Sequence, residues 1–278
     1  MPSTQTDIDG ITVFEDSCDL PDTAPAIVMV HGWPDTHRVW DGQVAALRDQ
    51  FRCVRFTLPG FDTSKPPRPT SLADMLVLFE RIAAHAGRGR PVTLLLHDWG
   101  CFFGYQFALS RPERVARVIG VDIGDVASVD FRRSLSTQAK LMAAGYQLWL
   151  ALAWKLSGQL GDRMTRWMAR ALRCPAEPAR IGAQMNYPYA MRWFGALGGF
   201  KAMKPLQTSA WPMLFIYGQR KPFMFHSPAW SAALAARPGC AVMGLRAGHW
   251  VMHNQPEAFN QALRDWLAGI AVARSEQP

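Results

Sequence analysis

The stretch Leu94-Leu-Leu-His-Asp-Trp-Gly-Cys-Phe-Phe-Gly104 decides the fold. It leads from the apolar run Val92 to Leu96, an expected strand, through Asp98 into a glycine that opens a helix reaching Leu109. Such a tight strand-to-helix turn exposes its central side chain, and N–H groups at the helix start can stabilise negative charge. Open α/β sheets carry their sites at this end of their strands. The stretch therefore predicts an α/β fold with Asp98 in its site.

Outward from this turn, short apolar runs alternate with longer mixed stretches. Strands are expected at Ala26–Val30, Phe51–Leu58, Val92–Leu96, Val115–Ile123, Pro212–Tyr217 and Cys240–Leu245. Helices are expected at Val39–Leu47, Leu72–Ala86, Ala229–Ala236 and Glu257–Ile270. Strands that are apolar on both faces and separated by helices predict a parallel sheet covered by helices on both sides.

The alternation stops at about Asp125 and returns after about Gln207. Between these points only helical periodicity is found, interrupted by prolines. We therefore expect a helical cap inserted into an α/β core, and no second independent domain. The predicted division is core for residues 1–125 and 208–278, and cap for residues 126–207.

Composition excludes several classes of protein. Of the 278 residues, 49% are hydrophobic and 19% charged, which permits a large core and excludes global disorder. No apolar run reaches the ~18 residues of a membrane span, and residues 1–10 do not resemble a signal peptide, so we expect a cytoplasmic protein. The five cysteines lack CxxC spacing, which indicates isolated thiols and neither a disulfide framework nor a metal site.

The net charge of +8 originates in the expected cap. Residues 127–207 contain twelve Lys and Arg against three Asp and Glu, together with four tryptophans. No nucleic-acid-binding motif is found there, so a solvated basic face over an aromatic interior is expected rather than a polyanion site. The predicted partners are a small apolar substrate and water, with no nucleic acid.

Asp98 is the candidate nucleophile. Serine enzymes with this turn place Ser within GxSxG, and no GxSxG occurs in the chain. A carboxylate nucleophile attacks a saturated carbon and forms an ester that water then hydrolyses. An isolated Asp-Trp-Gly is also typical of a helix N-cap, but the following segments favour catalysis.

The segment His31-Gly32-Trp33-Pro34 follows the preceding strand with a glycine turn. The N–H groups of Trp33 and Trp99 are therefore expected to form an oxyanion hole, with His31 supporting the loop.

The segment Gly248-His249-Trp250 follows the last strand, where such sheets present a general base. Among seven histidines, only His249 combines a strand end, a flanking glycine and a late position. His253 is its main rival.

These motifs resemble the α/β-hydrolase superfamily, in its aspartate-nucleophile branch of epoxide hydrolases and haloalkane or haloacetate dehalogenases. The resemblance covers residues 12–271 and rests on His31-Gly-Trp-Pro34, Leu58-Pro-Gly-Phe61, His97-Asp-Trp-Gly100 and Gly248-His249. It implies the α/β-hydrolase fold, with a mostly parallel eight-stranded sheet, helices on both faces and a helical cap inserted after strand six. It implies no cofactor and no metal.

The acid that would orient His249 has two locations in this family. After strand seven, where many members carry it, this chain has Lys221 in Tyr217-Gly-Gln-Arg-Lys-Pro222. The end of strand six supplies Asp122 and Asp125. Asp122 aligns with the acid of dehalogenases that use this position, so it is the predicted acid and Asp125 is the alternative.

Epoxide opening needs a proton donor for the leaving oxygen, usually phenols of the cap. The segment from Gly145 to Leu150 resembles the one that carries the first cap tyrosine of epoxide hydrolases, which assigns Tyr146. In Asn186-Tyr-Pro-Tyr189 the second tyrosine is either Tyr187 or Tyr189, because a proline is inserted between them.

Dehalogenation instead needs N–H donors aimed at a halide, and the Trp99 indole offers one. However, Trp33 replaces the Asn of one dehalogenase group, and Trp99 replaces the Arg of haloacetate dehalogenases. The sequence favours an epoxide hydrolase that forms a vicinal diol through a covalent alkyl-enzyme ester. A haloalkane dehalogenase is the alternative, a haloacetate dehalogenase is disfavoured further, and a non-catalytic small-molecule-binding relative is third. A monomer or homodimer is expected.

Overall fold

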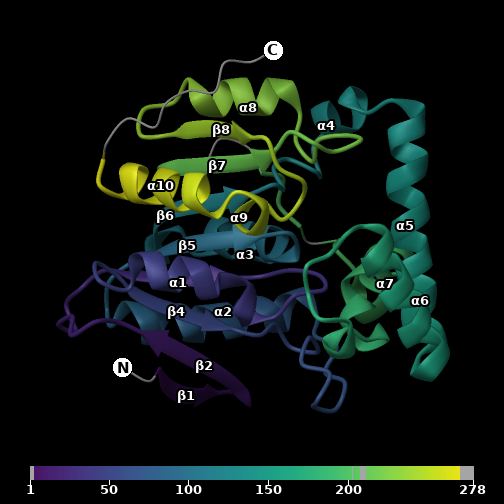
Figure 1. Cartoon of the computed structure of the whole chain (residues 1–278), viewed down its shortest axis with the longest axis horizontal. Helices are drawn as coiled ribbons and strands as arrows, with labels where there is room; N and C mark the ends of the chain where they lie inside the picture. Colours follow the sequence, from purple (N-terminus) through teal and green to yellow (C-terminus); the bar gives the residue numbers. More distant parts are fainter. Residues whose placement is uncertain (1–2, 202, 207–210, 270–278) are drawn as a thin grey trace.

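One eight-stranded sheet organises the chain (Figure 1). The computed structural model describes residues 3–201, 203–206 and 211–269. The strands are β1 Thr4–Ile8, β2 Ile11–Asp16, β3 Ala26–Val30, β4 Arg52–Phe56, β5 Val92–His97, β6 Val115–Val121, β7 Met213–Gly218 and β8 Ala241–Leu245. Their spatial order is β1-β2-β4-β3-β5-β6-β7-β8. Strands β3 to β8 are parallel, and β1 and β2 each pair antiparallel with a neighbour at one edge, which confirms the predicted mostly parallel sheet.

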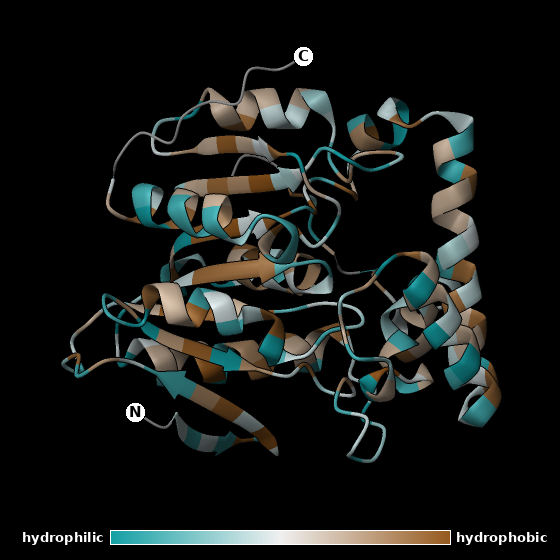
Figure 2. Ribbon diagram, viewed as in Figure 1, coloured by the Kyte–Doolittle hydropathy of each residue, from teal (hydrophilic) through white to brown (hydrophobic). Residues whose placement is uncertain are grey.

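Helices pack on both faces of the sheet (Figure 1). They are α1 Asp41–Leu47, α2 Leu72–Gly87, α3 Trp99–Ser110, α8 Pro228–Ala235, α9 Val251–Asn254 and α10 Pro256–Leu267. Side chains alternate between the faces of a strand, so Val28 and Val30 of β3 join the apolar cluster of α2 and α3. Ile27 and Met29 join the cluster of α1 and α10 on the other face. Figure 2 shows hydrophobic residues concentrated on these central strands.

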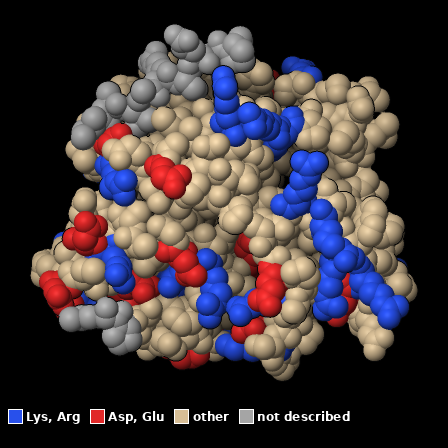
Figure 3. All heavy atoms as spheres, in the orientation of Figure 1, with Lys and Arg blue, Asp and Glu red and all other residues tan. Residues whose placement is uncertain are grey.

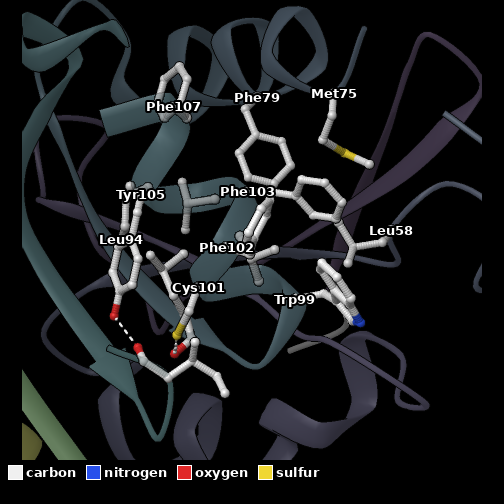
Figure 4. Close-up of a cluster of buried hydrophobic side chains, with 14 of the residues drawn as sticks. Leu58, Met75, Phe79, Leu94, Trp99, Cys101, Phe102, Phe103, Tyr105 and Phe107 are labelled. Atoms are coloured by element: carbon white, nitrogen blue, oxygen red, sulfur yellow. Dashed lines mark hydrogen bonds between the residues drawn. The ribbon is translucent and has the colours of Figure 1, made fainter. Parts of the chain in front are cut away.

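Helix α3 is buried on all sides between the sheet and α2. Every residue from Trp99 to Ala108 is buried. The ring of Phe107 packs edge-on against that of Phe79 in α2, with centroids 6.0 Å apart (Figure 4). The Tyr105 hydroxyl donates a 2.7 Å hydrogen bond to the carbonyl of Ile123, just beyond β6, the bond drawn dashed in Figure 4. This packing holds the start of α3, and with it Asp98, in a fixed position.

The segment between β6 and β7 is helical and covers the carboxyl ends of the strands (Figure 1). Its α-helices are α4 Val129–Ser134, α5 Thr137–Leu156, α6 Gly158–Ala171 and α7 Tyr187–Phe194. Short 3-10 turns occur at Pro178–Arg180, Ala183–Asn186 and Ala196–Gly198. Ser128 and Ser136 cap α4 and α5 by accepting hydrogen bonds from backbone N–H groups. The described residues of this segment contain no strand. The core and cap boundaries remain predictions, and residues 207–210 lie outside the described chain.

Several elements differ from the sequence-based expectation, among them α1, which begins at Asp41 after a 3-10 turn at His37–Trp40. Strands β1 and β2 and the short helix α9 were not individually predicted. The expected helix Glu257–Ile270 is α10, which ends at Leu267; Ile270 lies outside the described residues. None of the described helices is long and apolar enough to cross a bilayer.

Candidate active site

Asp98 occupies the turn between β5 and α3, as the sequence predicts. Its backbone has φ 51° and ψ −121°, a sparsely populated region for a residue with a side chain. The Trp33 N–H donates a 2.6 Å hydrogen bond to Asp98 Oδ1. One carboxylate oxygen is therefore held by the backbone, and the side chain remains 16% exposed for reaction at the other.

The loop after β3 approaches this turn so closely that it requires a glycine. A Cβ atom on Gly32 would overlap the Asp98 carboxylate and come within 2.5 Å of the Trp99 backbone nitrogen. The Trp33 N–H contacts the Asp98 carboxylate, and the Trp99 backbone nitrogen lies beside Gly32; their role as an oxyanion hole stays a prediction. His31 supports the loop: it is fully buried, and its Nε2 accepts a 2.9 Å hydrogen bond from the Leu58 N–H.

His249, in the loop after β8, lies between two carboxylates. Its Nε2 is 3.4 Å from Asp98 Oδ2, and its Nδ1 is 2.6 Å from Asp122 Oδ2. Asp122 follows β6 directly and has a φ of 69°. The structure therefore brings together three residues that the sequence predicted for this site, each from the end of a different parallel strand.

Asp125 and His253, which the sequence left as alternatives to Asp122 and His249, lie in different surroundings. Asp125 accepts hydrogen bonds from the N–H and hydroxyl of Ser227, at 2.7 Å each, and from the hydroxyl of Ser128, at 2.6 Å. It joins loops and is not paired with His249. His253 is exposed on α9 and is not among the residues that line the cavity at Asp98.

Lys221 is a partner of Asp122 that sequence reasoning missed. It forms an ion pair with Asp122 Oδ1, which also accepts a 2.9 Å hydrogen bond from the Gly218 N–H. The side chains of Lys221 and Asp122 are only 6% and 0% exposed. The sequence did draw attention to Lys221, because this residue stands after strand seven where many family members carry the acid. What could not be read was that it faces a carboxylate 99 residues away.

The charges of the site determine its protonation. Burial lowers the pKa of His249, but the hydrogen bonds and charges of Asp122 and Asp98 outweigh it and raise the pKa to about 9. Burial raises the pKa of Asp98, yet His249 and the Trp33 N–H bring it below its usual value. The resting site is therefore an imidazolium held between two carboxylates.

His97 directly precedes Asp98 in the chain and contacts His249. Its ring lies against that of His249, with centroids 4.5 Å apart, and its Nε2 is 3.2 Å from the His249 carbonyl oxygen. Burial lowers the pKa of His97 to about 3. A neutral imidazole in this place supports the His249 backbone without competing for its proton.

A cavity of about 390 Å³ opens in front of Asp98. Its walls are mostly apolar and come from both the core and the cap, including Trp99, Phe102, Ile123, Phe131 and Phe225. Tyr146 of α5 and Tyr189 of α7 also line it, with ring centroids 6.2 Å apart. Three cations, Arg132, Lys140 and Arg192, are also among the lining residues.

The structure distinguishes the two tyrosines that the sequence could not. The ring of Tyr189 packs edge-on against that of Trp99, with centroids 5.1 Å apart, and borders the cavity. Tyr187 is fully buried against Phe61, with centroids 6.0 Å apart, and does not line the cavity.

Asn186 links the cap to the loop after β3 that carries Trp33, a role that sequence reasoning missed. It is fully buried, and its Oδ1 accepts a 2.7 Å hydrogen bond from the Trp33 indole N–H. Its Nδ2 donates a 2.7 Å bond to the Thr165 hydroxyl on α6. The Trp33 indole is thereby turned away from the cavity and towards the cap.

The chain belongs to the α/β-hydrolase fold family, whose family model matches residues 25–252. This confirms the superfamily indicated by the sequence motifs. No group of three or more metal-binding side chains is found among the residues that the structure describes.

Known proteins similar to the chain include both enzyme types suggested by the motifs. A probable oxidoreductase, EphD, from Mycobacterium tuberculosis is 36% identical over 113 residues, which is 40% of this chain and only 19% of that protein. An epoxide hydrolase of Bacillus megaterium, solved with an inhibitor, has a TM-score of 0.66 and 21% identity over 95% of this chain and 100% of that one. A haloalkane dehalogenase loop variant from Bradyrhizobium elkanii has a TM-score of 0.64 and 19% identity, covering 96% of each chain. At these identities the two structures establish a shared fold.

Proposed function

We propose that this α/β hydrolase converts an apolar epoxide to a vicinal diol through an ester on Asp98. The observation that carries the proposal is that Asp98, Tyr146 and Tyr189 line one apolar cavity. A nucleophile and two phenols on one cavity suit ring opening, because the leaving oxygen stays tethered to the substrate and needs a proton.

In the first step, Asp98 Oδ2 attacks an epoxide carbon while Oδ1 stays bound to the Trp33 N–H. The ring carbon–oxygen bond breaks, and a phenol transfers its proton to the released oxygen. Burial raises the pKa of Tyr146 to about 12 and that of Tyr189 well above its usual value. Both phenols therefore keep their protons at neutral pH until an alkoxide forms.

In the second step, His249 takes a proton from water, and the resulting hydroxide adds to Cγ of the Asp98 ester. Negative charge develops on Oδ1, which faces the Trp33 N–H. Collapse of this tetrahedral intermediate breaks the bond between Cγ and Oδ2, and the alkoxide that leaves takes the proton from His249. The regenerated Asp98 carboxylic acid returns a proton through solvent to the tyrosinate, so epoxide and water yield diol.

The proximity of His249 to Asp98 gives the histidine two successive states. While Asp98 is anionic, its charge helps to hold the pKa of His249 at about 9, so the imidazole is protonated. Alkylation removes the Asp98 charge, and the pKa of His249 falls. The imidazole then releases its proton to solvent and can act as a base at the stage where water must be activated, and it takes a proton back from solvent once Asp98 is again anionic.

A haloalkane dehalogenase is the second candidate, favoured by the position of Asp122 at the end of β6. It would need N–H donors aimed at a halide. The Trp33 indole donates to Asn186 and is already engaged, and the Trp99 ring packs edge-on against that of Tyr189. A binding protein without catalysis would not require the 3.4 Å approach of His249 to Asp98.

Parallel incubation with styrene oxide and 1-bromobutane separates these functions. We expect diol from the epoxide and no bromide from the haloalkane, and Asp98→Asn should yield neither product. Bromide release without diol from any epoxide tested would overturn the proposal in favour of the second candidate.

The phenols can be tested individually. Tyr146→Phe and Tyr189→Phe should each slow diol formation by about 10², and the double variant should be nearly inactive. Tyr187→Phe is the matched control, because its hydroxyl does not border the cavity, and it should keep the wild-type kcat. A loss confined to Tyr187→Phe would show that the proton donor has been assigned to the wrong side chain.

A further inference from the structure

The outer face of α5 is apolar although no part of the described chain covers it. Along this helix six positions fall within an arc of about 100°. They are Leu141, Met142, Gly145, Trp149, Leu152 and Leu156. All six are exposed, and the side chains of Leu141 and Leu156 are 69% and 52% exposed. Helix α5 forms one edge of the molecule in Figure 1, and Figure 2 shows hydrophobic residues recurring along its visible side.

The apolar face continues onto α6. The Trp167 ring lies 5.2 Å from the Trp149 ring, and the Trp149 indole N–H donates a 3.0 Å hydrogen bond to the Met164 carbonyl. Trp167 and Leu160 are 52% and 58% exposed. We call this continuous surface of α5 and α6 the cap face.

Cations surround the cap face. Lys155, Arg163, Arg170 and Arg173 are exposed on or beside α5 and α6. Figure 3 shows basic side chains grouped over the α6 and α7 part of the cap. Within the described residues, none of these four cations pairs with a carboxylate.

Two of the three acids of the cap pair locally with arginines. Asp162 accepts a 2.7 Å hydrogen bond from the Ala183 N–H and lies 3.8 Å from the Arg166 guanidinium. Glu177 pairs with Arg180 at 2.9 Å. The third acid, Asp130, is exposed on α4, so the charge around the cap face is predominantly positive.

We infer that the cap face docks on an anionic lipid surface. Exposed leucines and tryptophans flanked by Lys and Arg are the composition of helices that lie in a membrane interface. Charge complementarity selects this occupant, because a second copy of the chain would place its own cations against these. Docking needs no membrane span, since the helices lie flat on the lipid.

The position of α5 connects docking to the cavity. Residues 140, 143, 144, 146 and 147 on the other sides of this helix line the cavity at Asp98. An apolar molecule dissolved in the bilayer would thus be concentrated within one helix diameter of the site.

Co-sedimentation of the intact protein with lipid vesicles tests the inference. Wild type should bind phosphatidylcholine vesicles that contain phosphatidylglycerol, should bind pure phosphatidylcholine much less, and should dissociate at high salt. The double variant Leu152→Glu/Leu156→Glu should bind about tenfold less or weaker still. Val77→Glu is the matched control, because Val77 is an apolar side chain, 53% exposed, on α2 and outside the cap.

Two controls keep the outcome interpretable. The double variant should retain its circular dichroism spectrum and its turnover of a water-soluble epoxide without vesicles, since neither leucine lines the cavity. If it fails to fold, Arg163→Glu/Arg170→Glu should weaken binding through charge alone. Failure of wild type to bind anionic vesicles would overturn the inference. So would a wild-type dimer in size-exclusion chromatography that Leu152→Glu converts to monomer, because a second copy would then cover the face.

Discussion

Asp122 and Asp125 are separated by only three positions, yet their carboxylates serve different partners. Asp122→Asn removes the charge that stabilises imidazolium on His249, so turnover should fall by a factor on the order of 10³ to 10⁴. Asp125→Asn weakens hydrogen bonds to Ser227 and should lower the melting temperature with little change in kcat. Steady-state kinetics and thermal unfolding of both variants check this. The reverse ordering of kcat would make Asp125 the acid.

Lys221 gives a second prediction at the residue scale. Its ammonium partly compensates the Asp122 carboxylate, so Lys221→Met should leave more negative charge facing His249 and raise the pKa of that imidazole. Because the proposed ester hydrolysis needs neutral His249, the rise of its rate with pH should move to higher pH, while Lys221→Arg should stay close to wild type. Single-turnover rates across pH measure the shift. An unmoved profile in Lys221→Met would assign Lys221 a purely structural role.

Some residue assignments were within reach of the sequence and others were not. Asp98 and His249 could be identified because short motifs at strand ends carry them. Tyr187 and Tyr189 could not be separated, because two positions on a helix differ by about 200° and only packing decides which one meets the cavity. Phe61 occupies the space beside Tyr187, and Trp99 lies beside Tyr189.

At the scale of elements, the buried amide of Asn186 is one of the links between cap and core. Asn186→Leu removes both of its hydrogen bonds and leaves the Trp33 indole N–H without a partner, whereas the Thr165 hydroxyl still donates to the Gly161 carbonyl. The free energy of unfolding should fall by about 1–3 kcal/mol for the indole N–H left buried and unpaired. Urea unfolding measures this. When Trp33→Phe is already present, Asn186→Leu should lower the free energy of unfolding by less. An equal loss with and without Trp33→Phe would mean that the hydrogen bond between Asn186 and Trp33 does not couple cap and core.

The strands and helices of the core followed from apolar periodicity, but the edge of the sheet did not. Strand β1 is polar and almost entirely exposed, so nothing in residues 4–8 requires it to be a strand. Its conformation comes from pairing with β2, whose alternating burial is readable only once the neighbouring β4 is in place. Edge strands with one partner have a weak pattern because half of their environment is solvent.

For the molecule as a whole, buried neutral histidines set the response to acid. Burial lowers the pKa of both His31 and His97 to about 3, and both side chains are fully buried. In the unfolded state these histidines bind protons below pH ~6.5, whereas in the folded state they stay neutral down to about pH 3. The folded state therefore has its full stability from these residues above pH ~6.5 and loses it as the pH falls towards 3. At pH 5 each should reduce the free energy of unfolding by ~2 kcal/mol.

Two other groups, Asp35 and His249, make the folded state less stable as the pH rises. Burial raises the pKa of Asp35 to about 7, so its contribution is complete at low pH and is lost as the pH rises through 7. The raised pKa of His249, about 9, gives stability that is lost between pH ~6.5 and 9. Thermal unfolding across pH should therefore show a maximum near pH ~6.5, with a steep fall on the acid side. Constant stability between pH 6.5 and 5 would contradict the neutral burial of His31 and His97.

The division between strand ends and cap helices has a consequence for how such a protein could diversify. Asp98, Asp122 and His249 are encoded in stretches that also build the sheet, whereas Tyr146 and Tyr189 belong to the intervening helices. Under the proposed function, mutation or recombination within that one intervening stretch of the gene could replace the proton donors and reshape the cavity wall. The groups that form and cleave the ester would be inherited unchanged. New substrates could then be acquired without the covalent chemistry having to arise again.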